Sequence, residues 1–376
     1  MLIDGYIEGY YGRLLNWTDR LNLLDRLGEL NINFYIYGPK EDPLHRARWM
    51  DLYSTEQEEN FKNFLEKSLQ SDVKIYIAIS PGLSYEKQSS LYLNKLFTKL
   101  DQFQEIGFTN FAIFFDDLDL KQNQSLGKLH GDIVNQVRGF LRNDDENSLF
   151  FCPTVYSNRF TKGNLEDCNY LQGLSKTIDL SIPIFWTGQD VVSEKISNSD
   201  INDLKKILNN PILVWDNYYA NDYCPTRFFI GPYKGRSFSE KTTLGFGINP
   251  TGLPITDSLI FSQVRKTLTT KQLLKKFEVP EAFLKILPFF SSPFDTVISK
   301  SNYKSLGDIK EIVRSLCIDW KSPLQLEWAP FLWSFFNDLN LQATIKTKRG
   351  KKSLEAWASR RYSDPLNKAM KIQKDK

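Results

Sequence analysis

The chain has 376 residues, of which 41% are hydrophobic, 25% charged and 14% aromatic, and this balance excludes a disordered, fibrous or collagen-like protein. Forty-eight Lys and Arg residues stand against 45 Asp and Glu residues, so the net charge of +3 gives no reason to expect nucleic acid or an anionic membrane as a partner. The length allows one barrel-sized domain with a smaller one, because single cores stop growing beyond roughly 250 to 300 residues.

Short apolar runs alternate with segments of helical periodicity over the first two thirds of the chain. Several runs are apolar on both faces, which is typical of strands buried between a core and a layer of helices. Eight runs are predicted to be strands: residues 2–8, 33–37, 74–79, 110–115, 149–152, 180–185, 212–215 and 243–248.

The segments between these runs predict amphipathic crossover helices. Apolar residues recur at helical spacing at positions 17, 21, 24 and 27, and again at 61, 64, 65 and 69. Eight strand and helix alternations of this size match an α/β protein with a (β/α)8 (TIM) barrel. A doubly wound open sheet is the competing architecture on this pattern alone.

Polar and aromatic residues follow nearly every predicted strand. In a parallel barrel the carboxyl ends of all strands meet at one mouth, where the active sites of such enzymes are built, whereas an open sheet would not bring all eight together. The residues at or just past these ends include Glu8, Gly9, Lys40, Asp116, Asp117, Tyr156, Trp186, Trp215, Asn217 and Asn249.

The chain after residue 258 is predicted to be helical. We therefore expect a catalytic barrel over residues 1–258 and an α-helical C-terminal domain with a basic tail over 259–376. Residues 328, 332, 335, 336 and 339 form an apolar stripe, which fits either a helix packed inside a small bundle or a homodimer interface. Residues 346–376 hold eleven Lys or Arg and three Asp or Glu, a pattern usual for a solvated tail.

The counts of histidine and cysteine narrow the chemistry further. His45 and His130 are the only histidines, which excludes multi-histidine metal sites and favours carboxylates as acids and bases. The four cysteines are widely spaced and no secretory segment precedes them, so we expect free thiols in a cytoplasmic protein. No apolar stretch reaches the roughly 20 residues that cross a bilayer, so no membrane partner is expected.

Asp116 and Asp117 are the strongest catalytic candidates. They come directly after the apolar run 111–115, so two carboxylates emerge side by side into the expected barrel mouth. Repulsion between them in apolar surroundings should raise the pKa of one member and make it a proton donor near neutral pH. The alternative is a helix cap beside a solvated loop residue.

The adjacency of the two aspartates bears on the mechanism. A retaining glycosidase with a protein nucleophile places its two carboxyl groups about 5 to 5.5 Å apart across the scissile bond, usually from different strands. Adjacent residues suit one proton transfer and one orienting contact, with the nucleophile supplied by the substrate. The carbonyl oxygen of a 2-acetamido sugar is such a nucleophile.

Aromatic residues near the other strand ends could contact the faces of a sugar ring, although large aromatics also fill barrels. Polar residues close to these ends offer hydrogen bonds to hydroxyls, although each could equally serve its own loop. The aromatic set is Tyr11, Tyr156, Trp186, Trp215 and Tyr223, and the polar set is Lys40, Asn217, Asp222 and Asn249.

Eight segments, in the same order along the chain, resemble glycoside hydrolase family 84, the O-GlcNAcase family. The resemblance begins with IEGYYGR, NFYIYGPKEDPLHRARW and FAIFFDDLD, and it continues with FFCPTVY, FWTG, VWDNYYANDY, FFIGPYKGR and GINP. These segments cover the expected barrel. The C-terminal third shows no motif that matches residue by residue.

The resemblance implies a role for each matching residue. Asp116 would accept the acetamido N–H and direct the carbonyl oxygen at the anomeric carbon, Asp117 would be the general acid and then the base, and Tyr156 would hydrogen-bond at the forming oxazoline. Asn217 would hold the acetamido group and Trp215 would wall its pocket. Ring hydroxyls would be bound by Gly9, Lys40, Asp222 and Asn249, with Tyr11 as a further contact.

The leading hypothesis is an exo-acting retaining β-N-acetylglucosaminidase that needs no cofactor or metal and acts on an N-acetylglucosamine-bearing glycoprotein or glycan. A second hypothesis keeps the chemistry but changes the substrate to a hyaluronan-type chain or a small N-acetylhexosaminide. A third is a non-catalytic protein that binds N-acetylglucosamine. The presence of both aspartates and Tyr156 argues against the third, because a binder would not need an acid at Asp117.

Overall fold

The structure is a computed structural model that describes residues 2–83, 90–143, 145–161, 163–224, 226–265, 268–294 and 305–359. The chain divides into two compact units. The first is Met1–Tyr218 with Lys234–Gly252, and the second is Tyr219–Tyr233 with Leu253–Lys376. The boundary expected between residues 258 and 259 falls inside helix α7 (Pro254–Val264), which groups with the second unit. The last part of the basic tail, residues 360–376, lies outside the described residues.

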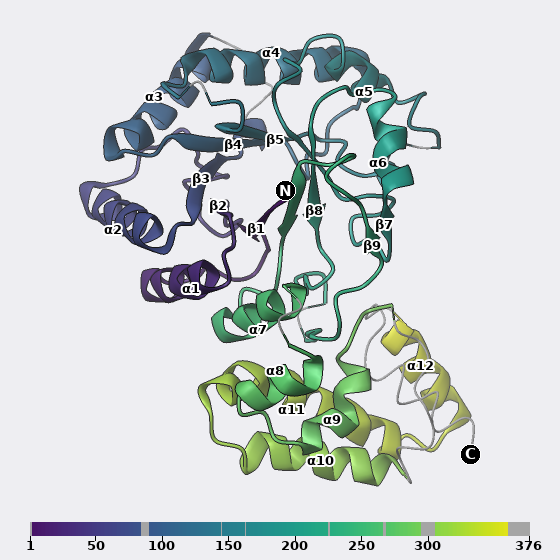
Figure 1. Ribbon diagram of the computed structural model, residues 1–376. Helices are drawn as coiled ribbons and strands as arrows, with labels where there is room; N and C mark the ends of the chain where they lie inside the picture. The colour runs from purple at the N-terminus through teal and green to yellow at the C-terminus, as the bar shows by residue number, and fades with distance from the viewer. Residues whose placement is uncertain are drawn as a thin grey trace. The chain divides into compact units, whose positions relative to one another are not determined.

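Within the described part of the first unit, eight parallel strands close into a barrel in the order β1-β10-β8-β6-β5-β4-β3-β2 (Figure 1). This confirms the predicted (β/α)8 barrel and rules out the open doubly wound sheet. The barrel strands are β1 (Ile3–Glu8), β2 (Phe34–Tyr37), β3 (Lys74–Ile79), β4 (Asn110–Phe114), β5 (Leu149–Cys152), β6 (Ile184–Trp186), β8 (Ile212–Asp216) and β10 (Gly245–Ile248). A separate short parallel pair joins β7 (Ile196–Ser197) to β9 (Arg236–Ser237).

Aromatic side chains fill the barrel interior. The ring of Trp215 lies 5.2 Å from that of Phe114 and 5.3 Å from that of Phe185, each measured between ring centroids. These rings belong to one buried cluster that also contains Phe34 and Phe150. The barrel is therefore a packed core, and a ligand must bind at its end.

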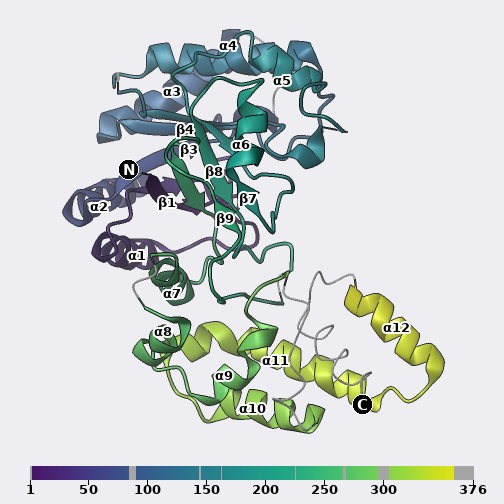
Figure 2. The same ribbon diagram turned by 45° about the vertical axis from the view of Figure 1, so that its right-hand side comes forward.

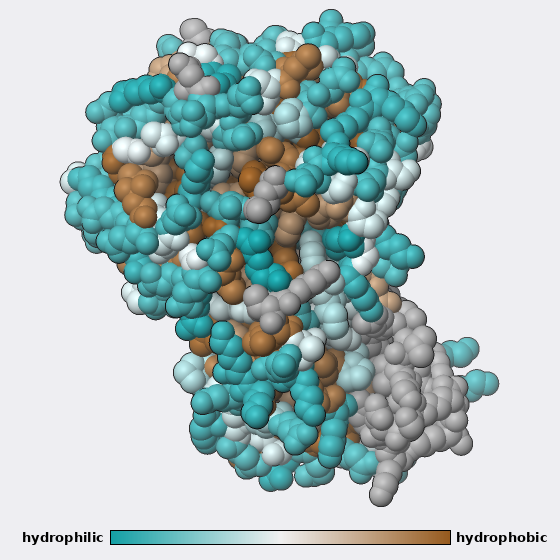
Figure 3. Space-filling model, viewed as in Figure 1, coloured by the Kyte–Doolittle hydropathy of each residue, from teal (hydrophilic) through white to brown (hydrophobic). Residues whose placement is uncertain are grey.

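Helices cover the outside of the barrel in the first unit (Figures 1 and 2). They are α1 (Trp17–Glu29), α2 (Thr55–Ser71), α3 (Ser90–Ile106), α4 (Gln124–Phe140), α5 (Asn169–Leu174) and α6 (Asn198–Lys205). Polar residues begin several of them: the side chains of Asn16, Ser54, Asn123 and Ser197 each accept a backbone N–H of the first helical turn. On the face in Figure 3, hydrophilic side chains cover most of the described surface of this unit.

Two details of the predicted elements were wrong. The sixth strand was expected over residues 180–185 but spans Ile184–Trp186, and Leu180 lies in a turn with 58% of its surface exposed. Pro183 explains the late start, because proline has no N–H to donate to a neighbouring strand. Leu69 was assigned to the apolar face of its helix but is 74% exposed.

From α7 onward the described residues of the second unit are mainly helical, as predicted for the C-terminal region. Its helices are α7, α8 (Thr270–Lys276), α9 (Ala282–Ile286), α10 (Leu306–Ile318), α11 (Pro323–Thr344) and α12 (Lys348–Ser359). Most of the predicted apolar stripe on α11 is core: Trp328, Leu332, Phe335 and Leu339 have no exposed surface. Trp333, Leu326 and Leu341 on the same helix are exposed.

Candidate active site

The candidate catalytic residues lie at the carboxyl ends of the barrel strands. Asp116 and Asp117 follow β4, Lys40 follows β2, and Tyr156 follows β5. The register places Phe114 opposite Cys152, so β4 and β5 end at similar levels. The side-chain hydroxyl of Thr154 donates to the carbonyl of Phe115 at 2.8 Å and ties the two strand ends together.

Asp116 is a buried carboxylate with one oxygen engaged and one open. The residue is 5% exposed, and its Oδ2 forms an ion pair with Nζ of Lys40, whose side chain is 1% exposed. Oδ1 is buried and has no hydrogen-bond partner among the described residues. A buried carboxylate oxygen without a donor is costly, so this atom is suited to accept an N–H from a ligand.

Lys40 is committed to Asp116 and to aromatic rings. Its Nζ lies 5.5 Å from the ring centroid of Phe114 and 5.8 Å from that of Tyr11, within the range of cation–π attraction. The sequence indicated a contact of Lys40 with a ligand but not this ion pair. The charge of Lys40 favours the ionised form of a carboxylate beside it.

Asp117 keeps access to solvent and receives two tyrosine hydroxyls. Tyr156 donates to its Oδ1 at 2.6 Å and Tyr11 donates to its Oδ2 at 2.7 Å. Its backbone has φ of 54°, a left-handed conformation that is uncommon outside glycine. Such strain persists where surrounding contacts enforce it and is frequent at functional sites.

The pKa of Asp117 lies below its ordinary value. Partial desolvation raises it, but the charge of Lys40 and the donated hydroxyls of Tyr156 and Tyr11 together outweigh desolvation. Burial, and after it the Asp117 carboxylate, raises the pKa of both tyrosine hydroxyls, so both stay protonated and remain donors. The resting contacts of Asp117 thus favour its ionised form, and the expectation that one of the pair is a proton donor near neutral pH stays a prediction.

Arg46 is a site residue that the sequence did not single out. One nitrogen, Nη1, donates to the hydroxyl of Tyr11, and Nη2 donates to the backbone carbonyl of Asp117 at 3.4 Å. The residue is half-buried in the turns after β2. Its only sequence signal is its place six residues after Lys40 in the PKEDPLHR segment.

Four of the predicted ligand-binding residues form one hydrogen-bonded group on β1, β8 and β10. Asn249 accepts the backbone N–H of Gly9 at 3.2 Å and donates to Oδ1 of Asn217 at 2.9 Å. The indole of Trp215 also donates to Oδ1 of Asn217 at 3.0 Å, while Nδ2 of Asn217 donates to the carbonyl of Val191 at 2.8 Å. The amide of Asn217 thus links the end of β8 to the end of β10 and to the segment that contains Val191.

Asp222 groups with the second unit, as does Tyr223 of the predicted aromatic set. Its Oδ1 accepts the backbone N–H of Tyr223 at 2.9 Å. Its assignment to ligand binding stays a prediction.

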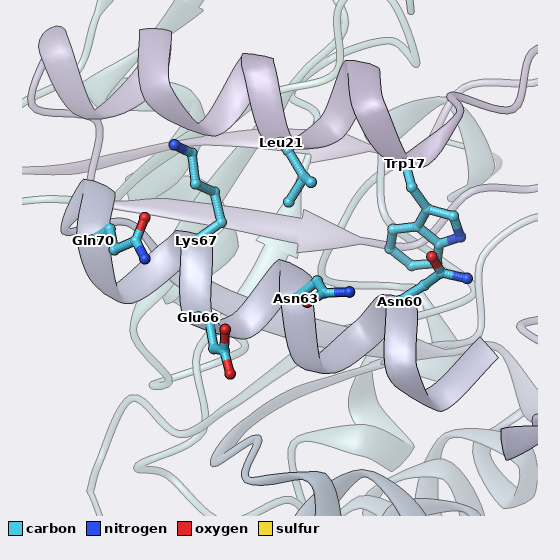
Figure 4. Close-up of a pocket in the computed structure, with 7 residues that line it drawn as sticks. All are labelled: Trp17, Leu21, Asn60, Asn63, Glu66, Lys67 and Gln70. Atoms are coloured by element: carbon cyan, nitrogen blue, oxygen red, sulfur yellow. The ribbon is translucent and has the colours of Figure 1, made fainter. Parts of the chain in front are cut away.

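A groove of about 230 Å³ lies between α1 and α2 (Figure 4). Trp17 and Leu21 line it from α1, and from α2 it is lined by Asn60, Asn63, Glu66, Lys67 and Gln70. Figure 4 shows these side chains between the two helices, and none of them is among the predicted site residues.

The described residues hold neither a membrane-spanning helix nor a candidate metal cluster. No helix among them is both long and apolar enough to span a membrane. No cluster of three or more His, Cys, Asp or Glu residues within the described ranges could hold a metal ion.

Comparison with known proteins agrees with this geometry. The sequence pattern of a family described as β-N-acetylglucosaminidase (NAGidase) matches residues 4–261. Protein O-GlcNAcase of Mus musculus is 34% identical over 240 residues, and that of Rattus norvegicus is 33% identical over 240 residues. Each alignment covers 62% of this chain and 26% of the relative, so the chain spans about a quarter of the length of these curated relatives.

A solved structure extends the likeness in fold to the whole chain. It is a mutant O-GlcNAc hydrolase from Thermobaculum terrenum, with a TM-score of 0.77 and 23% identity over 99% of this chain and 93% of the other. The family match spans every barrel strand except the first residue of β1, and it includes Asp116, Asp117 and Tyr156. The chain therefore belongs to the β-N-acetylglucosaminidase family, glycoside hydrolase family 84.

Proposed function

We propose that this chain is an exo-acting retaining β-N-acetylglucosaminidase that cleaves β-linked N-acetylglucosamine by substrate-assisted catalysis. The observation that carries the proposal is the open Oδ1 atom of Asp116, buried at the end of β4 directly before Asp117. The names of the mouse and rat relatives favour a β-linked N-acetylglucosamine on protein as the substrate.

In the first step, Oδ1 of Asp116 accepts the acetamido N–H of the bound sugar. This increases the electron density on the acetamido carbonyl oxygen, which forms a bond to the anomeric carbon as the glycosidic C–O bond breaks. Asp117 transfers a proton to the departing oxygen. The products are the free aglycone and a protonated oxazoline (oxazolinium), in which the acetamido oxygen is bonded to the anomeric carbon and the nitrogen keeps its proton in the hydrogen bond to Asp116.

In the second step, water opens the oxazoline. Asp117, now ionised, takes a proton from the water as its oxygen bonds to the anomeric carbon and the bond to the acetamido oxygen breaks. Two inversions at this carbon give net retention. The ion pair with Lys40 supports the role of Asp116, because the orienting carboxylate must stay ionised throughout.

Asp117 must gain a proton before the first step, and its resting contacts oppose this. We propose that the bound glycoside displaces at least one of the two tyrosine hydroxyls, with Tyr156 turning to the acetamido oxygen. Removal of a donor and of water then raises the pKa of Asp117 in the complex. The chemistry needs no cofactor.

We further propose a cellular location and an oligomeric state for the protein. Cys152, Cys168 and Cys317 are buried free thiols, which supports a reducing cytoplasmic location. A homodimer through the C-terminal helices stays a prediction, and Trp333, Leu326 and Leu341 are the exposed apolar side chains of α11 that could contribute to it. Sedimentation at micromolar concentration tests it, and a monomer there contradicts it.

The function is tested by comparing an aryl β-N-acetylglucosaminide with the matching aryl β-glucoside, which lacks the acetamido group. We expect turnover of the first and none of the second. Turnover of both would assign the nucleophile to a protein carboxylate. Binding of N-acetylglucosamine without turnover of either would favour the non-catalytic alternative.

A further inference from the structure

Arg46 makes two contacts at the acid that the proposed reaction does not use. Its Nη1 donates to the hydroxyl of Tyr11 and its Nη2 to the backbone carbonyl of Asp117 at 3.4 Å. The guanidinium carbon lies 5.5 Å from the ring centroid of Tyr11. Arg46 thus forms hydrogen bonds with both Tyr11 and the backbone of Asp117.

The hydroxyl of Tyr11 passes this contact on to the carboxylate. Its oxygen accepts from Arg46 while its proton is donated to Oδ2 of Asp117 at 2.7 Å. A hydroxyl that accepts from a cation is a stronger donor, because linked hydrogen bonds polarise one another. Tyr11 is 40% exposed, and its hydrogen bonds with Arg46 and Asp117 restrict the orientation of its ring.

The groups that face Asp117 come from several barrel loops. Lys40 after β2, Tyr156 after β5, Tyr11 after β1 and Arg46 itself all favour the ionised carboxylate. Asp116 is the neighbouring carboxylate, and like charges repel. Tyr156 reaches Oδ1, whereas the Arg46 and Tyr11 pair controls Oδ2. The two carboxylate oxygens thus accept from two different tyrosines, and Arg46 donates a hydrogen bond to the hydroxyl of one of them, Tyr11.

We propose that Arg46 is a positioning residue for proton transfer, which holds Tyr11 on Oδ2 of Asp117 and keeps this carboxylate ionised at rest until a bound glycoside displaces the tyrosine hydroxyl. The kinetic consequence of this role rests on the proposed function. The contact itself does not, because it is present without substrate.

The direct test is a titration of the Asp117 carboxyl carbon by NMR in protein labelled at aspartate, with the signal assigned by its loss in Asp117→Asn. Arg46→Met removes both donors at similar side-chain length. It should raise the midpoint of the Asp117 titration by on the order of half a pH unit or more, because the ionised form loses a charge and a strengthened hydrogen bond.

Arg48→Met is the matched control. Arg48 lies two residues further on, is exposed, and pairs with Asp51 at 3.4 Å, so its loss changes the net charge equally without touching the site. The midpoint should stay at its wild-type value in this control. Equal midpoints in Arg46→Met and wild type, or equal shifts in both variants, would overturn the proposal.

Tyr11→Phe tests whether Arg46 acts through the tyrosine. This variant should also raise the midpoint of the Asp117 titration. Adding Arg46→Met to Tyr11→Phe should then produce a much smaller further shift than Arg46→Met produces in the wild type, since the two residues act through linked hydrogen bonds. Fully additive shifts would show that Arg46 does not act through Tyr11 but only as a nearby charge, and would contradict the proposal.

Enzyme kinetics give a second readout. In Arg46→Met the alkaline limb of kcat/KM should move to higher pH, because the acid stays protonated further up the pH scale. A loss of activity at all pH values with an unmoved limb would indicate a merely structural role. If the wild type hydrolysed no glucosaminide, the proposed function would fail while the carboxyl titration would still decide the role of Arg46.

Discussion

Lys40 and Asp116 form an ion pair across the barrel mouth, with the Lys40 side chain 1% and the Asp116 side chain 7% exposed. They are 76 residues apart in the chain and meet because β2 and β4 end at the same rim. Removing one partner of a buried pair leaves the other charge without compensation, at a cost of about 3–5 kcal/mol. A variant at either position therefore leaves an uncompensated buried charge at the barrel mouth.

Asp116→Asn should reduce turnover of every aryl N-acetylglucosaminide, whatever the leaving group. Oxazoline formation is impaired in each case, because an amide orients and polarises the acetamido N–H less well than a carboxylate. The measurement is kcat/KM across a series of phenols of different acidity. Asp119→Asn, at an exposed loop position, is the control, and a wild-type rate in Asp116→Asn would remove Asp116 from the mechanism.

Asp117→Asn should depend strongly on the leaving group. Poor leaving groups need protonation and should lose on the order of a hundredfold or more, whereas activated aryl glycosides should retain much of their rate. Plotting log kcat against the acidity of the phenol should give a steeper line for the variant than for the wild type. Parallel lines would contradict the assignment of Asp117 as acid.

Tyr156→Phe should move the alkaline limb of kcat/KM to higher pH. The Tyr156 hydroxyl donates to the ionised carboxylate and so lowers the pKa of Asp117, and its removal lets that pKa rise. An acid with a higher pKa stays protonated to a higher pH. A limb that moves to lower pH would show that Tyr156 stabilises the protonated form instead.

Gly9→Ala should displace the side chain of Trp215 at the barrel mouth. A Cβ at this position would lie 2.6 Å from Cζ2 of Trp215, so the indole must shift and its bond to Asn217 would be lost. We expect kcat/KM to fall on the order of tenfold or more, because small misplacements of binding groups are costly. Gly139→Ala is the control, since a Cβ there meets nothing within 4 Å, and equal losses in the two variants would exclude a specific role for Gly9.

Both histidines should make the fold less stable as pH falls. Burial lowers the pKa of His45 and of His130 to about 3 from an ordinary value of 6.5, with the charge of Lys40 contributing at His45. Below pH 6.5 the unfolded chain binds these protons and the folded chain does not, so stability is complete above 6.5 and declines from there toward pH 3.

Urea unfolding of wild type and His130→Gln from about pH 6 to pH 4.5 checks this loss of stability. The decline should be smaller in the variant by about 1.4 kcal/mol per pH unit once the pH is well below the unfolded pKa. Identical slopes would mean that His130 is protonated in the folded protein.

The barrel was predictable because most of its strands coincide with short apolar runs in the sequence. Runs such as 110–115 are apolar on both faces, and only a strand covered on both sides explains this pattern. The sixth strand was misplaced because Leu180 and Ile182 look like strand residues, while Pro183 delays the pairing until Ile184. Periodicity carries no information about which backbone N–H groups find a partner.

The site was predictable where position alone identified a residue. Asp116 and Asp117 stood out because two carboxylates follow a buried strand. Arg46 did not, because its contact with Asp117 spans 71 residues and depends on the turns after β2 and on the left-handed backbone of Asp117. The lowered pKa of Asp117 could not be predicted for the same reason: the sequence displays the neighbouring carboxylate but not the lysine and hydroxyls that fold against it.

The central claim is that the acetamido oxygen of the substrate is the nucleophile. Aryl β-glucosaminides with zero to three fluorine atoms on the N-acetyl group test it directly, because fluorine withdraws electrons from that oxygen while the sugar hydroxyls stay unchanged. The account predicts that kcat falls steeply with each added fluorine, with the same leaving group throughout. A kcat that does not change across the series would contradict it and assign the bond-forming atom to the protein.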